Sequence, residues 1–152
     1  MTMRYFFAAC PVLAICACHY VSTNASLIDP TLHLAKTCPA AVKLYTVPDR
    51  VQQPYQEIAL LNSAGKTSYS SEDDMIKSMR EKAASVGANG IILSGIVEPS
   101  EMAKIAGRVA QIGADAAGAI TDISAERKAR AMAIYVPADS AHTIAACTKA
   151  RT

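Results

Sequence analysis

A capped amphipathic helix that leads directly into an apolar strand restricts the fold more than any other feature. Ser71-Glu-Asp-Asp74 has the pattern of a capping box, in which the serine hydroxyl and the later carboxylate each bond the other residue's backbone N–H. Apolar residues then recur at helical spacing, and Gly87 stands where a left-handed residue would end the helix. We therefore predict a helix over 72–86 with one apolar face.

The strand that follows sets the fold class. Residues 90–97 (GIILSGIV) are apolar at consecutive positions, which is typical of a central strand, and Gly95 within them predicts a bulge or a close backbone approach. Residues 63–70 are polar and predict a turn. Three other segments predict strands: 41–47, 57–62 and 130–136.

The order of these segments predicts an α+β fold. We expect a small mixed sheet of about four strands with two helices packed on one face. The helix between 57–62 and 90–97 predicts a βαβ crossover at its core. A further short helix is predicted within 139–152.

An Ala/Gly-rich insert, residues 100–122, contains the second predicted helix, which extends to about residue 112. Large apolar residues recur there at helical spacing: Met102, Ile105, Val109 and Ile112. Small residues fall roughly along one face and would let another surface approach closely: Ala103, Gly107, Ala110, Ala114 and Gly118. Two interpretations stay open, a flexible surface insert and a surface on which a partner docks.

The N-terminus has the features of a secretion signal. Arg4 precedes an uncharged apolar stretch over 5–17, which is too short to span a bilayer. The stretch ends in Ile15-Cys16-Ala17-Cys18, which resembles the lipobox of bacterial lipoproteins. The resemblance implies that 1–17 is a removed signal peptide and that the Cys18 thiol carries a palmitate-type lipid. The alternatives are an ordinary secretory signal and an uncleaved anchor.

The same resemblance implies a location. His19, rather than Asp, follows Cys18, and this implies attachment to the outer membrane, facing the periplasm. Residues 18–36 are polar and rich in turn formers, so we predict a tether there, with its second half alternatively docked on the domain through leucines. A single domain is predicted over 37–148.

The five cysteines of the sequence then fall into three groups. Cys10 and Cys16 leave with the signal and Cys18 takes lipid, so Cys38 and Cys147 remain as an even pair in an oxidising compartment. A disulfide between them would close a loop of about 110 residues. The alternative is two independent buried thiols.

A helix-to-strand signature provides a second resemblance. Residues 83–91 (AASVGANGI), together with 54–60 and the Cys38-Pro39-x-Ala41-Val42 stretch, resemble small envelope lipoproteins such as RcsF and the YbjQ-type domains. RcsF uses four structural cysteines where two remain here, so its signalling is not implied. The motif predicts a glycine cap, a tight turn and entry into a buried strand, and it contains no catalytic group.

The search for reactive groups predicts a protein that is not an enzyme. A net charge of +2 argues against a dedicated nucleic-acid binder. No G-x-S-x-G motif or phosphate loop occurs, and His19, His33 and His142 are isolated. We expect no metal and no cofactor beyond the lipid on Cys18. The predicted function is a binding module anchored to the outer membrane, with an envelope protein as candidate partner. The alternative is a redox or metal sensor that uses Cys38, Cys147 and His142.

Overall fold

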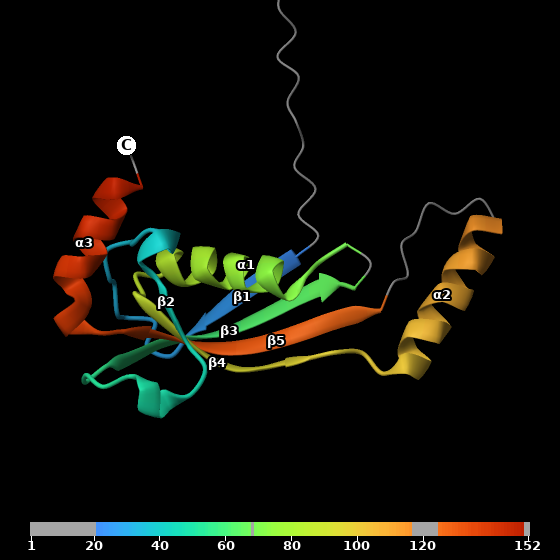
Figure 1. The fold of residues 1–152 in the computed structure, drawn as a ribbon, viewed down its shortest axis with the longest axis horizontal. Helices are drawn as coiled ribbons and strands as arrows, with labels where there is room; N and C mark the ends of the chain where they lie inside the picture. Colours follow the sequence, from blue (N-terminus) through green and yellow to red (C-terminus); the bar gives the residue numbers. More distant parts are fainter. Residues whose placement is uncertain (1–20, 68, 117–124, 151–152) are drawn as a thin grey trace, which may run out of the picture.

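The computed structural model describes residues 21–67, 69–116 and 125–150. Within these residues the chain forms a mixed α+β fold with a five-stranded sheet and three α-helices (Figure 1). The predicted class is confirmed, and the expected four strands and two helices differ from the structure in detail. The predicted signal peptide over 1–17 and Cys18, the predicted lipidation site, lie outside the described residues.

Strand order differs from the predicted crossover. The strands are β1 (Val21–Leu27), β2 (Lys43–Tyr45), β3 (Gln56–Lys66), β4 (Gly90–Val97) and β5 (Glu126–Tyr135), in the order β1-β3-β5-β4-β2. Neighbouring strands are antiparallel except β2 and β4, which are parallel. β3 and β4 therefore run in the same direction with β5 between them. The expected direct βαβ pairing is wrong because β5, which is distant in sequence, pairs with both strands.

Strand β1 corrects the predicted tether. It lies within 18–36 and pairs antiparallel with β3, from Val21 opposite Gly65 to Leu27 opposite Ala59. The sequence conceals its alternation because polar residues occupy both sides. The Thr23 hydroxyl, for example, contacts Ser63 at 3.0 Å and Ser78 at 2.7 Å. Leu32 and Leu34 pack against the core, as the alternative interpretation of this stretch expects.

Strand β3 also runs further than predicted. Residues 63–66, expected to begin a turn, continue the strand and pair with the start of β5. Ser63 is buried there, and a side chain on Gly65 would collide with Ser70. Small residues therefore suit a crowded strand end, whereas in sequence they are typical of a turn.

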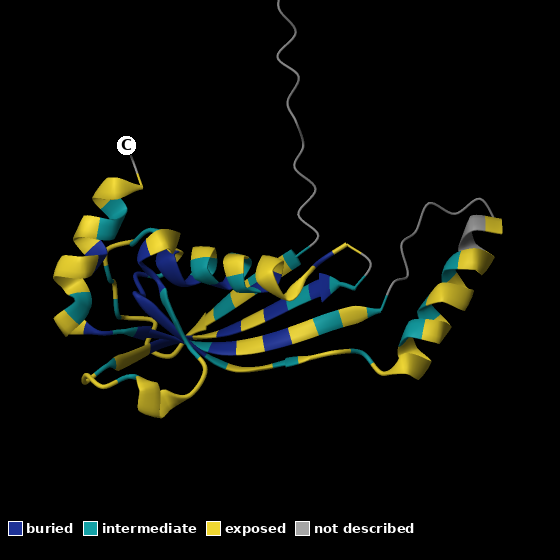
Figure 2. Cartoon of the chain, viewed as in Figure 1, coloured by how far each residue is buried: buried dark blue, intermediate teal, exposed yellow. Residues whose placement is uncertain are grey.

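Helix α1 (Glu72–Ser85) covers one face of the sheet, and the main core lies between the two (Figure 2). Met75, Met79 and Ala83 are completely buried against the sheet. The predicted capping box is confirmed, because Ser71 Oγ accepts the Asp74 N–H at 3.1 Å and the Asp74 carboxylate accepts the Ser71 N–H at 2.9 Å. The opposite face of the sheet has a smaller apolar cluster around Ile92, Ile134 and Val136.

The other two helices lie at the two ends of the sheet. Helix α3 (Ser140–Lys149) packs against a 3₁₀ turn, η1 (Pro39–Ala41). Helix α2 (Glu101–Ala116) extends from the opposite end and shares few contacts with the other described elements (Figure 1). Among the helices of the described residues, only α1 packs on a face of the sheet, whereas two helices on one face are expected from the sequence. In the described part of the chain, every helix is too short or too polar to traverse a bilayer.

Candidate functional site

Several chain segments meet at one end of the sheet, which we call the α2 end. Val21 lies opposite Gly65, and Gly65 lies opposite Arg127, near the start of β5. Val97, the last residue of β4, lies opposite Lys128. Residues 98–125 connect β4 to β5 and contain helix α2. We call this connection the excursion and its two ends, next to β4 and β5, the stems. The start of β1, the end of β3 and the stems are therefore at the same level of the sheet.

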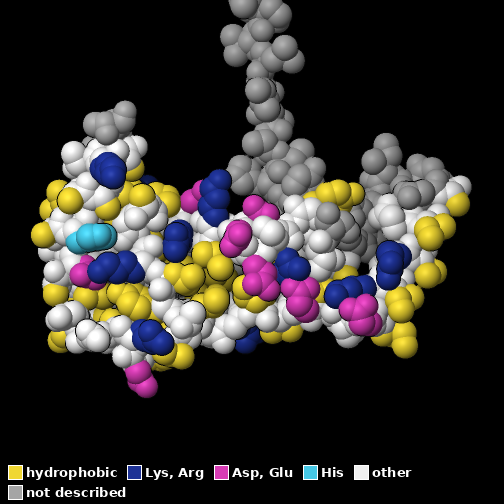
Figure 3. Space-filling view, in the orientation of Figure 1, with side chains coloured by type: hydrophobic (Ala, Val, Ile, Leu, Met, Phe, Trp, Pro, Cys, Tyr) yellow, Lys and Arg dark blue, Asp and Glu magenta, His cyan; other side chains and the backbone are white. Residues whose placement is uncertain are grey.

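Helix α2 has an apolar stripe that no described element covers. Its four large side chains are largely exposed: Met102 at 76%, Ile105 at 49%, Val109 at 65% and Ile112 at 69%. Figure 3 shows hydrophobic side chains along the outer edge of this helix, turned away from the sheet. An amphipathic helix normally packs its apolar stripe on a core. A contiguous exposed stripe of this kind is a candidate interaction surface.

Local polar contacts define where α2 begins. The Ser100 hydroxyl accepts the Ala103 N–H at 3.2 Å, as an N-cap does. Lys104 forms an ion pair with Glu101 at 2.9 Å. This hydrogen bond from Lys104, assisted by the lysine's charge, lowers the pKa of the Glu101 carboxyl. The polar side of the helix is thus stabilised within the helix itself.

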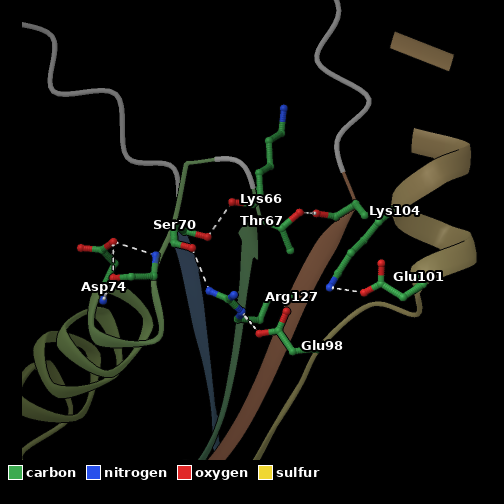
Figure 4. Close-up of polar contacts among 10 residues, drawn as sticks. Lys66, Thr67, Ser70, Asp74, Glu98, Glu101, Lys104 and Arg127 are labelled. Carbon is green, nitrogen blue, oxygen red and sulfur yellow. Dashed lines mark hydrogen bonds and ion pairs between the residues drawn. The ribbon is translucent and has the colours of Figure 1, made fainter. Parts of the chain in front are cut away.

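The base of the excursion is fixed to the sheet (Figure 4). Arg127 at the start of β5 pairs with Glu98 just after β4, and it donates to the Ser70 carbonyl at 2.8 Å. The Thr67 N–H and hydroxyl both donate to the Ala125 carbonyl, at 3.0 Å and 2.8 Å. The two ends of the excursion are therefore held to each other and to the segment that follows β3. Helix α2, beyond them, has few neighbours.

A pocket of about 700 Å³ lies beside these stems. It is lined by Ser94, Gly95, Val97, Glu98, Pro99, Glu126, Lys128 and Arg130. Gly95 has a φ of +148° and marks a shift in register with β5, which confirms the predicted bulge. The lining combines two cations and two carboxylates without histidine or cysteine. It offers ion pairing to a polar ligand.

The predicted cysteine pair lies at the opposite end of the sheet. In the structure Cys38 and Cys147 form a disulfide with Cα atoms 5.4 Å apart, and Cys147 Sγ also accepts the Cys38 N–H at 3.1 Å. The bond links η1 to α3. His142, the third residue of the alternative sensor hypothesis, is exposed on α3. Across residues 21–67, 69–116 and 125–150, no three His, Cys, Asp or Glu side chains cluster in a way that could hold a metal.

Asn89 is a structural residue that the sequence analysis does not single out. It is 1% exposed, and its amide pairs with both backbone groups of Val136, accepting at 2.8 Å and donating at 2.9 Å. Its backbone carbonyl accepts the Lys43 N–H. It therefore joins β2, β4 and the end of β5. The signal that could have found it is one amide residue within an otherwise small or apolar run, 88–93.

The fold and the α2 end define a small α+β domain with an exposed amphipathic helix. No family model and no curated protein matches this sequence. Among solved structures, a Francisella virulence factor, FvfA, is similar, with 18% sequence identity and a TM-score of 0.48. The alignment covers 74% of this chain and 96% of that chain. A likeness of this degree supports no statement about this protein's function.

Proposed function

We propose that this protein is a lipoprotein, anchored to the outer membrane through Cys18 and facing the periplasm, that acts as a non-enzymatic binding module. The observation that carries the proposal is the exposed apolar stripe of α2 at the end of the sheet where β1 begins. The lipobox-like Ile15-Cys16-Ala17-Cys18 and the resemblance to small envelope lipoproteins support the anchor. The Cys38–Cys147 disulfide is in keeping with an oxidising compartment.

The α2 stripe supports a binding role on energetic grounds. Exposed apolar surface costs about 25 cal/mol per Å² relative to burial. A helix of this length is also marginal in water without tertiary packing. A partner that covers the stripe would supply both the burial and the packing. We therefore assign the binding surface to α2 and place the candidate partner, an envelope component, at the α2 end.

The anchor is tested by metabolic labelling with a palmitate analogue. We expect label on the wild-type protein, loss of label in Cys18→Ala, and retention in Cys38→Ala, which removes a cysteine not expected to carry lipid. Absence of label from the wild-type protein, or label that survives Cys18→Ala, would contradict the anchor.

The binding surface is tested by crosslinking in isolated membranes. A photoreactive residue at position 112, on the stripe, should form adducts that the same residue at position 144 does not form. Ile144 is a matched control for Ile112 because it is similarly exposed, at 68% against 69%, and lies on α3. Equal adduct yields at both sites would contradict a binding surface on α2.

A further inference from the structure

We propose that α2 is an interfacial helix whose apolar stripe docks on the phospholipid surface of the membrane that holds the lipid anchor. The inference rests on the proposed lipidation of Cys18, and it names the occupant of the exposed stripe. The stripe comprises Met102, Ile105, Val109 and Ile112.

The length of chain between the anchor and the sheet is the first argument. Because β1 begins at Val21, only two residues separate it from Cys18. A chain extends at most about 3.6 Å per residue, so Cys18 lies within roughly 11 Å of the start of β1. The 18–36 tether expected from sequence would instead let the domain stand far from the bilayer. The structure therefore brings this domain close to the membrane surface.

The location of α2 is the second argument. The start of β1 is level with the end of β3 and the start of β5, and the excursion that contains α2 leaves from the same end. Figure 1 shows α2 extending beyond this end of the sheet, while α3 and η1 lie at the other end. The anchor and the stripe therefore belong to the same end of the molecule. Once the lipid is inserted, contact of α2 with the bilayer is an intramolecular event with a high effective concentration.

The chemistry of α2 is the third argument. Interfacial helices combine an apolar face with a charged face and lie in the plane of the membrane surface. The charges of α2 line one flank of the stripe, with Glu101, Lys104 and Arg108 at helical spacing. The aliphatic stems of Lys104 and Arg108 let their charged groups reach the headgroup layer. Sixteen residues make a helix of about 24 Å, which suits the surface and does not span the hydrocarbon core.

The test uses tryptophan as a reporter, because the chain contains none. The mature lipidated protein carrying Val109→Trp is reconstituted into vesicles of phosphatidylethanolamine and phosphatidylglycerol, with and without bromine on the acyl chains. Ile144→Trp is the matched control, since Ile144 is 68% exposed and Val109 is 65% exposed. We expect a blue-shifted emission that brominated lipid quenches for Val109→Trp, and neither change for Ile144→Trp. Adding Ile105→Asp to Val109→Trp should abolish the quenching.

The outcomes separate this inference from the proposed function. Mass spectrometry of the Cys18 peptide in the same preparation reports lipidation. An unlipidated Cys18 overturns the proposed function and this inference together. A lipidated Val109→Trp protein whose emission stays red-shifted and unquenched overturns the inference alone. A blue shift without bromine quenching shows a protein surface over the stripe, a second copy or another partner, and also overturns it. Circular dichroism that matches the wild-type protein confirms that each variant is folded.

Discussion

At the scale of single residues, the side-chain amide of Asn89 bonds backbone groups where β2, β4 and the end of β5 meet. Its side chain satisfies the N–H and the carbonyl of Val136, which is itself buried. We predict that Asn89→Ala lowers the free energy of unfolding by about 2–4 kcal/mol, because it leaves buried backbone groups without partners. Urea unfolding measures the loss. Asn62→Ala, on the exposed side of β3, is the control and should change stability by less than about 1 kcal/mol.

Gly87 is required by its conformation and by its surroundings. Its φ is +86°, and a Cβ there would overlap the Leu34 side chain and come 3.0 Å from the Ala35 carbonyl oxygen. We predict that Gly87→Ala destabilises the protein by at least about 2 kcal/mol in thermal unfolding, from left-handed strain and displacement of Leu34. Gly113→Ala is the opposite case, because nothing lies within 4 Å of its Cβ position. That variant should be neutral or stabilise α2 by up to about 1 kcal/mol. Equal effects of the two substitutions would contradict this account.

At the scale of elements, the N-terminus of α1 depends on reciprocal capping. We predict that Ser71→Ala lowers the free energy of unfolding by about 1 kcal/mol, because the Asp74 N–H loses its acceptor.

The Ser71 backbone N–H, and then its hydroxyl, lower the pKa of Asp74 from 3.8. A lowered pKa in the folded state adds stability above pH 3.8 that is lost as the pH falls through the lowered value. Asp74→Asn should therefore flatten the acid decline in stability, measured by urea unfolding across this range. Asp73→Asn is the matched control, because it removes one carboxylate from the same helix turn and leaves the Ser71–Asp74 capping box in place.

The elements also show which features local sequence can determine. Helix α1 is predicted within one residue because its cap, stripe and terminal glycine are all local signals. Strand β1 is missed because an edge strand of Ser, Thr and Asn pairs through its backbone, with little apolar alternation. The position of β5 between β3 and β4 depends on contacts between distant segments. In the candidate site, the pattern predicts the α2 stripe but not its exposure, since the same pattern usually packs on a core.

At the scale of the whole molecule, the disulfide ties the segment that enters η1, between β1 and β2, to helix α3. Cys38 and Cys147 are 109 residues apart in sequence, and their bond restricts most of the unfolded chain. In the chain-entropy model such a loop contributes about 4–5 kcal/mol. We predict that peptide mapping without reductant finds the Cys38–Cys147 cross-link. Reductant should lower the thermal midpoint of the wild-type protein and leave the Cys38→Ala/Cys147→Ala variant unaffected. Two free thiols in the oxidised protein would contradict the structure here.

The molecule should also fold without its α2 excursion. β4 and β5 pair directly up to Val97 and Lys128, and the Glu98–Arg127 ion pair closes the base of the excursion. Because α2 shares few contacts with the sheet, deletion of 100–122 removes little burial from the core. It also shortens the connection from roughly thirty residues to about five, which favours folding by about 1–2 kcal/mol.

We therefore predict that the deletion variant unfolds cooperatively in urea, with a stability equal to or above that of the full chain. If the deletion variant keeps the sheet but no longer forms crosslinks in isolated membranes, the excursion has a role in binding. A loss of more than about 2 kcal/mol would instead mean that α2 stabilises the domain, and it would remove the reason to look for a partner on its apolar stripe.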